Sequence, residues 1–249
     1  MQLSTRGLII KEQNIGEQDK LVTVLTEDRG VIRAFVRQGK NIKSKNAAAT
    51  ALLSYSEFRI YQSKDRYIID SAELLELFYD LRRDIEKLAL AQYFCELASF
   101  YAPQDTPSHD FLRLLLNSIY LVTKGQKPNK IIKAAFEMRL LSMAGYMPDL
   151  LACRHCGAYE STIMYLLVEE GALVCSNCYP GGSTALALSK GVLTALRHTI
   201  YADFSKLFSF DLPVPAQEQL AHVAEHYVKN QSDRTFQTLE FYHTVESIS

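Results

Sequence analysis

The residues that decide the fold are the runs "RGLIIKEQ" at 6–13, "DKLVTVLTEDRG" at 19–30 and "VIRAFVRQG" at 31–39. Each run carries β-branched or aromatic residues in partial alternation, and small or polar residues separate one run from the next. This pattern is typical of short strands joined by turns. Two further runs, "SYSEFRIYQS" at 54–63 and "RYIIDSAEL" at 66–74, repeat it. Five short strands in succession predict a small barrel.

The pattern changes after residue 78. In "DLRRDIEKLALAQYFCELASFYA" (80–102) the apolar positions recur closer to every 3.6 residues than to every two, which predicts a helix. Further helices are predicted at 109–123, 129–145, 189–203, 214–229 and 233–246, the last three behind Ser189, Pro213 and Asp233. We therefore expect an α+β protein with a five-stranded barrel at 1–79, for which the OB-fold, a barrel that binds single strands or oligosaccharides, is one economical solution. An all-helical domain at 80–249 follows, with a four-cysteine zinc insert at about 150–182.

Composition is that of an ordinary globular protein. The 249 residues are 48% apolar, and 27 basic side chains nearly balance 28 acidic ones. The opening "MQLSTRGLIIKEQN" has no apolar signal core, and no run of about 18 apolar residues follows. We expect a cytoplasmic protein, whose cysteines stay reduced.

The balanced total conceals a local excess of positive charge. Between residues 29 and 56 there is no acidic residue and there are six basic ones: Arg29, Arg33, Arg37, Lys40, Lys43 and Lys45. Alternation along one strand places Arg33 and Arg37 on the same face as Phe35. Such a region indicates DNA or RNA as the leading partner. A solvated loop is the alternative for the lysines, and an acidic protein is the alternative partner.

Two aromatic residues of the predicted strands are candidates for stacking on bases. They are Phe35 and Tyr61, since an aromatic ring offers a stacking surface to any base. A place in the core is the more common role of a strand aromatic.

A second signal is the cysteine spacing C-x2-C-x18-C-x2-C, formed by Cys153, Cys156, Cys175 and Cys178. Two residues between cysteines allow one tight turn to present both sulfurs to one ion, and the intervening segment is long enough for a hairpin that returns the second pair. Gly157 fits the turn and Gly171 the reversal. The spacing predicts one zinc ion. Disulfides or a redox dithiol are the alternatives.

Four thiolates fill a tetrahedral zinc site and leave no position for substrate, so we expect a structural ion. His155 could replace one ligand, although a solvated turn residue is the simpler interpretation, and Cys95 is expected in the core. We hypothesise that removing zinc loosens residues 150–182 and lowers stability while binding by the barrel persists.

The segment "HVAEH" (222–226) has the H-x-x-E-H order of one class of zinc peptidases, with His222 and His226 as ligands and Glu225 as base. A solvated helix face is the alternative, because short patterns recur by chance. No Walker A loop, G-x-G-x-x-G or G-x-S-x-G motif occurs. By elimination the sequence favours a binding protein over a zinc hydrolase or another enzyme.

Taken in order, four segments resemble the RecO family of bacterial recombination mediators. Residues 5–40 resemble the opening of the family, including the turn with Glu17 and Asp19, and residues 81–101 are similar to the helix after its barrel. "FEMRLLSMAGYMPDLLACRHCGA" (136–158) resembles the helix that runs through Gly145 and Tyr146 into the first cysteine pair, and "GALVCSNC" (171–178) resembles the return pair. The resemblance covers nearly the whole chain.

The resemblance implies a protein of DNA repair that is not an enzyme. Members of the family bind single- and double-stranded DNA, anneal complementary strands and help to load recombinase onto DNA coated by single-strand-binding protein. They work with RecR and in many bacteria with RecF, which implies a cytoplasmic, nucleoid-associated location. The loop "RQGKNIKSKNAAAT" (37–50) keeps the lysines but has fewer arginines than is usual in the family.

Relatives also capture the acidic tail of single-strand-binding protein on the helical domain. A groove for such a tail needs an apolar floor with cations at its rim, and one helix has that spacing: Lys130, Lys133, Phe136, Arg139 and Leu140. A core helix with solvated lysines is the alternative, since any amphipathic helix shows the same pattern.

Overall fold

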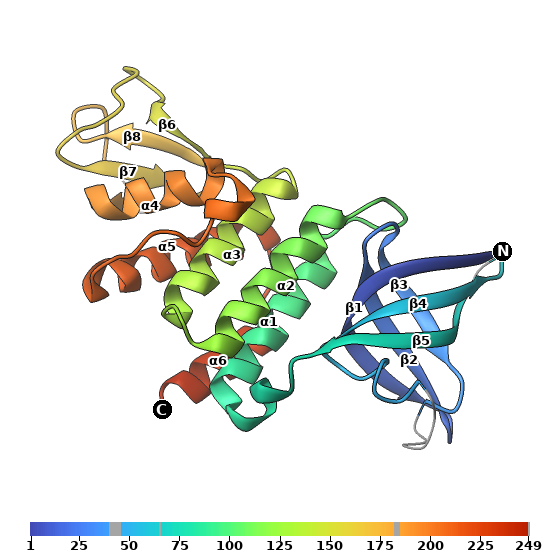
Figure 1. Cartoon of the computed structure of the whole chain (residues 1–249). Helices are drawn as coiled ribbons and strands as arrows, with labels where there is room; N and C mark the ends of the chain where they lie inside the picture. Colours follow the sequence, from blue (N-terminus) through green and yellow to red (C-terminus); the bar gives the residue numbers. More distant parts are fainter. Residues whose placement is uncertain (40–45, 65, 182–184, 249) are drawn as a thin grey trace. The chain divides into compact units, whose positions relative to one another are not determined.

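A computed structural model of the chain describes residues 1–39, 46–64, 66–181 and 185–248 (Figure 1). These residues form nine strands and six α-helices, so the fold is α+β as predicted. The chain divides into two compact units, which we call the barrel unit (Met1–Lys124 with Phe236–Ser249) and the ribbon unit (Gly125–Thr235). The predicted domain boundary at residue 79 falls inside the barrel unit, and it stays a prediction.

Five strands of the barrel unit close into a barrel in the order β1-β2-β3-β5-β4 (Figure 1). They are β1 (Gln2–Ile15), β2 (Asp19–Thr26), β3 (Gly30–Val36), β4 (Ser54–Gln62) and β5 (Tyr67–Leu77). Neighbouring strands are antiparallel except β3 and β5, which run parallel and pair only over residues 34–36 and 67–69. The predicted five strands are confirmed.

An apolar core fills the barrel. It is built from inward-pointing side chains of all five strands: Ile9, Val22, Val24, Ile32, Ala34, Val36, Phe58, Ile60 and Ile69. On β2 and β3 these are every second residue, which leaves the intervening positions on the outer face. Thr23, Arg33 and Phe35 occupy such outer positions. The core therefore fixes which side chains face outward.

Helices complete the barrel unit. They are the short 3-10 helix η1 (Tyr79–Arg83), α1 (Ile85–Tyr101), α2 (His109–Lys124) and α6 (Gln237–Glu246). Asp84 caps α1 by accepting a hydrogen bond from the N–H of Lys87. The ring of Phe236 meets Tyr93 edge-on, with centroids 6.2 Å apart. Cys95 is buried as predicted, and burial raises the pKa of its thiol.

The ribbon unit contains helices and a small sheet. The helices are α3 (Asn129–Met143), α4 (Lys190–Tyr201), α5 (Val214–Ser232) and the 3-10 helix η2 (Phe204–Lys206). The strands, in the order β6-β8-β7-β9, are β6 (Asp149–Cys153), β7 (Met164–Leu167), β8 (Ala172–Cys175) and β9 (Ala185–Leu188). The predicted hairpin between the cysteine pairs is confirmed as β7 and β8, which pair antiparallel.

Two expectations about this part of the chain are wrong. The region after residue 80 is not all-helical outside the insert, because β9 lies beyond residue 182 and pairs with β7. Four residues are too few to show a period. Asp233 does not cap the last helix but ends α5 with a left-handed φ of 48°, a conformation that Asp tolerates. The last helix begins at Gln237 instead. Among the described residues, no helix combines the length and apolar character of a membrane span.

Candidate metal centre and nucleic-acid interface

The four cysteines of the C-x2-C pairs lie together in the ribbon unit. Their sulfur atoms are all within 4.8 Å of one another, and the Sγ atoms of Cys156 and Cys175 are 3.6 Å apart. Cys153 ends β6 and Cys175 ends β8, so the sheet holds one cysteine of each pair in place. Both are buried, whereas Cys156 is exposed. The cluster is a site that can hold a metal ion.

Backbone turns aim the second cysteine of each pair back at the first. The N–H of Gly157 donates to the carbonyl of Cys153 at 2.8 Å, and the N–H of Cys178 donates to that of Cys175 at 3.0 Å. Gly157 has a φ of +73° and Gly171 one of +58°, which glycine adopts without strain. The turns predicted at both glycines are confirmed. His155 is exposed and lies outside the sulfur cluster.

The electrostatics of the cluster suit a cation. Burial acts to raise the pKa of Cys153, but backbone N–H groups of Cys175, Cys156 and His155 overcome it and lower the pKa to about 6. Hydrogen bonds with the thiols of Cys156 and Cys175 raise the pKa of Cys178 to about 12. The four thiols therefore do not all ionise by themselves near neutral pH. A coordinated cation removes this limit by compensating the thiolate charges.

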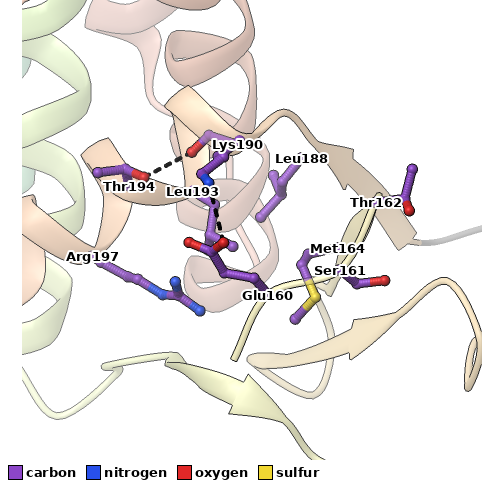
Figure 2. Close-up of a pocket in the computed structure, with 9 residues that line it drawn as sticks. All are labelled: Glu160, Ser161, Thr162, Met164, Leu188, Lys190, Leu193, Thr194 and Arg197. Carbon is purple, nitrogen blue, oxygen red and sulfur yellow. Dashed lines mark hydrogen bonds and ion pairs between the residues drawn. The ribbon is translucent and has the colours of Figure 1, made fainter. Parts of the chain in front are cut away.

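Arg197 of α4 anchors the edge of the small sheet at β6. Its guanidinium group donates to the carbonyls of Leu150, Leu151 and Tyr159 at 2.7, 3.0 and 2.8 Å and lies 3.9 Å from the centroid of the Tyr159 ring. Arg197 also lines a small cavity of about 30 Å³, in which Lys190 Nζ donates a hydrogen bond to Glu160 at 3.1 Å. Figure 2 shows these side chains around the cavity. Nothing in the sequence marks Arg197, because its partners are backbone atoms far away along the chain.

The predicted basic residues are partly described. Arg33 and Arg37 are exposed and Arg29 is half-buried, and none of the three forms an ion pair within the described residues. Lys40, Lys43 and Lys45 lie outside the described residues. Both stacking candidates lie outside the barrel core, since Tyr61 is 53% exposed and Phe35 is half-buried. DNA binding by these residues stays a prediction.

Two further cations near the outer face of β2 and β3 were not predicted from the sequence. The guanidinium carbon of Arg66 lies 5.9 Å from the centroid of the Phe35 ring. Lys11 on β1 lies opposite Thr23, which lies opposite Arg33. Both residues lie outside the basic segment 29–56 along the sequence, and only the pairing of the strands brings them close to that segment. A count along the sequence could not have found them.

The H-x-x-E-H segment does not form a zinc site. The two carboxylate oxygens of Glu225 are held by ion pairs, at 3.0 Å from Lys133 Nζ and at 3.0 Å from Lys229 Nζ. His222 and His226 are exposed, with ring centroids 4.4 Å apart. Among the described residues, only the four cysteines gather three or more metal-binding side chains. The helix-face interpretation is favoured.

The predicted partner groove on α3 has no open floor. Phe136 and Leu140 are buried, and Lys133 is 2% exposed, with Nζ 2.8 Å from Glu137 Oε1. Arg139 is half-buried and donates to the carbonyls of Ile200, at 2.9 Å, and Ala202. Lys130 pairs with Glu218. These placements favour the core-helix alternative, with the difference that Lys133 is buried rather than solvated.

Comparison with known proteins agrees with the resemblance seen in the sequence. The model of the recombination protein O N terminal matches residues 1–78, and that of the recombination protein O C terminal matches residues 82–240. The chain is 33% identical to the DNA repair protein RecO of Acetivibrio thermocellus over 246 residues, which cover 99% of this chain and 98% of the relative.

Two further relatives carry the same name. The DNA repair protein RecO of Caldicellulosiruptor bescii is 27% identical over 98% of this chain and 99% of its own length. That of Symbiobacterium thermophilum is 28% identical over 97% and 96%. The matches leave out neither the barrel unit nor the ribbon unit. The chain therefore belongs to the recombination protein O (RecO) family of DNA repair proteins, which is not a family of enzymes.

Proposed function

We propose that the protein is a recombination mediator of DNA repair. It binds single- and double-stranded DNA through the barrel, anneals complementary strands and helps to load recombinase onto DNA coated by single-strand-binding protein. The observation that carries the proposal is the outer face of β2 and β3 in a member of the RecO family. There Arg33 is an exposed cation, and Arg37 is another in the turn directly after β3; neither forms an ion pair among the described residues.

The barrel supports this function through its topology. The strand order β1-β2-β3-β5-β4 favours an OB-fold, a barrel that binds oligonucleotides on the face of its second and third strands. Here that face carries Thr23, Arg33 and Phe35. Cations neutralise backbone phosphates and release counterions, so binding is expected to weaken steeply with salt.

The cysteine cluster fits zinc in a structural role. Zinc–sulfur bonds of about 2.3 Å in a tetrahedron place the sulfurs about 3.8 Å apart, close to the 3.6 Å between Cys156 and Cys175. All four positions are filled by thiolates from Cys153, Cys156, Cys175 and Cys178. When bound, the ion supplies cross-linking of the two turns. The two turns then keep their positions relative to each other.

Partners of the family complete the proposal. RecR, with RecF in some bacteria, and the tail of single-strand-binding protein are proposed to bind this protein, in a cytoplasmic, nucleoid-associated location. Of the five residues predicted for the tail, only Lys130 and Arg139 keep partly exposed surface. If the tail binds α3, it meets the cations at the rim rather than Phe136 or Leu140.

Annealing of two complementary oligonucleotides at low salt without ATP tests the function. The wild type should accelerate annealing, and an Arg33→Ala/Arg37→Ala/Lys40→Ala/Lys43→Ala variant should lose the acceleration. A wild type that neither accelerates annealing nor binds DNA in a salt-sensitive way would overturn the proposal. That outcome would point to a scaffold whose basic run meets an acidic protein.

A further inference from the structure

We propose that a polar pocket on the outer face of β1, β2 and β3 holds one nucleotide of a single strand, with its phosphate between Lys11 and Arg33. The proposal rests on the proposed DNA binding by the barrel. It adds the place where a nucleotide binds, the cation Lys11 outside the basic segment 29–56, and a preference for single strands over duplex.

The pocket lies wholly within the barrel unit and has a volume of about 500 Å³. That size falls in the range of sites for small organic ligands, roughly 300–1,000 Å³, and suits a nucleotide. Its lining is mostly polar and combines cations, hydroxyl groups and amides with the apolar residues Val31 and Ile32. The lining includes Lys11, Thr23, Arg33, Ser99, Gln104 and Asp105.

Cross-strand register sets the spacing of the two cations. Lys11 is paired with Thr23 and Thr23 with Arg33, so the three residues form one row across the outer face. Adjacent strands place paired Cα atoms about 5 Å apart, which separates Lys11 and Arg33 by about 10 Å. Both side chains are long enough to meet at a phosphate between them, with the Thr23 hydroxyl below it. Neither cation forms an ion pair within the described ranges.

A bulge in β1 brings Lys11 into this row. Ile9 points into the barrel core, so strict alternation would also point Lys11 inward. The register shifts between Ile9 and Lys11, and the extra residue Ile10 reverses the alternation. Lys11 is consequently exposed on the outer face. Burial of a lysine in the barrel would be costly, and the bulge avoids it.

The far wall of the pocket is tied to the hairpin of β2 and β3. The N–H of Val31 donates to the carbonyl of Pro103 at 2.9 Å, and Gly30 bridges Gln104. Gly30 has a φ of +61°, and a Cβ there would lie 2.0 Å from the Pro103 oxygen. Only glycine therefore permits this close approach. The wall is held in place before any ligand arrives.

One acidic group also lines the pocket. The carboxylate of Asp105 accepts a hydrogen bond from the Tyr67 hydroxyl at 3.0 Å, which engages part of its charge. The pocket is thus lined by two cations and one carboxylate, and it favours an anion near the cations. A phosphodiester carries one negative charge and matches this arrangement.

The pocket also distinguishes single-stranded from double-stranded DNA. A nucleotide in a duplex is paired and stacked, and extruding it into a pocket costs a few kcal/mol. A nucleotide of a single strand is already free to enter. The pocket therefore strengthens binding of single strands selectively, whereas exposed cations elsewhere on the barrel attract both forms.

The test compares two charge-matched double variants by fluorescence anisotropy, on an oligo(dT) 15-mer and on a 15-base-pair duplex. Lys11→Met/Arg33→Met removes both pocket cations, and Arg59→Met/Lys64→Met removes two exposed cations that do not line the pocket. We expect the pocket variant to lose about tenfold or more in affinity for oligo(dT). The slope of log K against log[salt] should shrink by about 0.7, because one neutralised phosphate is lost. The control should lose less on the single strand.

A third variant separates shape from charge. Ser99→Phe fills the pocket from α1 without changing any charge, and it should lower oligo(dT) affinity severalfold while duplex affinity stays within about twofold. Unfolding curves for each variant show whether the fold is kept. The proposed nucleotide site is overturned if Ser99→Phe binds oligo(dT) as tightly as the wild type does, or if the two double variants lose equal affinity for it. DNA binding by the barrel would still stand in either case. A wild type that binds neither oligonucleotide overturns both.

Discussion

The barrel and the ribbon hold their functional side chains in opposite ways. In the barrel the core is apolar, and the polar residues of interest point outward from strands whose positions the core already fixes. In the ribbon the strands are four or five residues long and the thiols converge on one another. A region with its own core can present a surface to a partner. Strands this short are joined by turns, and an ion bound by the thiols would cross-link those turns.

Two lysines repeat this contrast. Lys11 is exposed and has no ion pair among the described residues, whereas Lys133 is buried between Glu137 and Glu225 at 2.8 and 3.0 Å. Burial acts to lower the pKa of Lys133, but the two carboxylates raise it above its ordinary value. The same residue type is exposed in one unit and part of the internal structure in the other, so charge along the sequence does not by itself locate a partner surface.

Breaking the metal site should give the largest effect on stability. Cys175→Ser removes one of the four thiols, so the protein should lose the proposed zinc ion and several kcal/mol of stability in the ribbon unit. Metal analysis and hydrogen exchange over residues 150–178 measure the two effects. Cys95→Ala is the control, since that thiol lies in the barrel unit, and it should keep one zinc per chain. Unchanged metal content and exchange in Cys175→Ser would contradict the assignment.

Breaking the buried ion cluster should come next. Lys133→Met leaves Glu137 buried without its cation, which should cost about 3–5 kcal/mol, measured by urea unfolding. Lys130→Met removes a partly exposed partner of Glu218, and it should cost no more than about 1 kcal/mol. Similar losses in the two variants would show that burial does not separate these lysines.

Glycine substitutions sharpen the comparison within the barrel. Gly30→Ala meets both a left-handed φ and the Pro103 oxygen, and it should cost about 2–4 kcal/mol. Gly16 has a similar φ of +56°, but a Cβ added there would have no other atom within 4 Å, so Gly16→Ala should cost only about 1–2 kcal/mol. Equal losses in thermal unfolding would mean that the contact with Pro103 does not constrain the hairpin.

The pH dependence of Lys133 gives the smallest expected effect. Because its pKa in the folded protein is raised, its contribution to stability is fully present below pH 10.5 and is lost as the pH rises through the folded value. The difference in unfolding free energy between the wild type and Lys133→Met should therefore shrink above pH 10.5. A difference that stays constant to about pH 12 would exclude this linkage.

The strands, the helices and the cysteine cluster were predicted because each depends on residues that are close together in the sequence. Alternation indicated the barrel strands, the 3.6-residue period indicated the helices, and the cysteine spacing indicated the cluster of Cys153 and its partners. The outcomes that escaped depend on contacts distant along the chain. The bulge at Ile10 turns Lys11 outward, Glu225 reaches Lys133 from another helix, and β9 exists because its backbone pairs with β7. No window of neighbouring residues contains that information.

The most direct test of the account measures single-strand binding by Cys175→Ser and by Arg33→Ala/Arg37→Ala side by side, with an unfolding curve for each. We predict that the cysteine variant is destabilised yet binds oligo(dT) nearly as the wild type does. The arginine variant should keep its stability and lose most of its affinity. Loss of binding in the cysteine variant, with binding retained in the arginine variant, would contradict the division between a binding barrel and a metal-held ribbon.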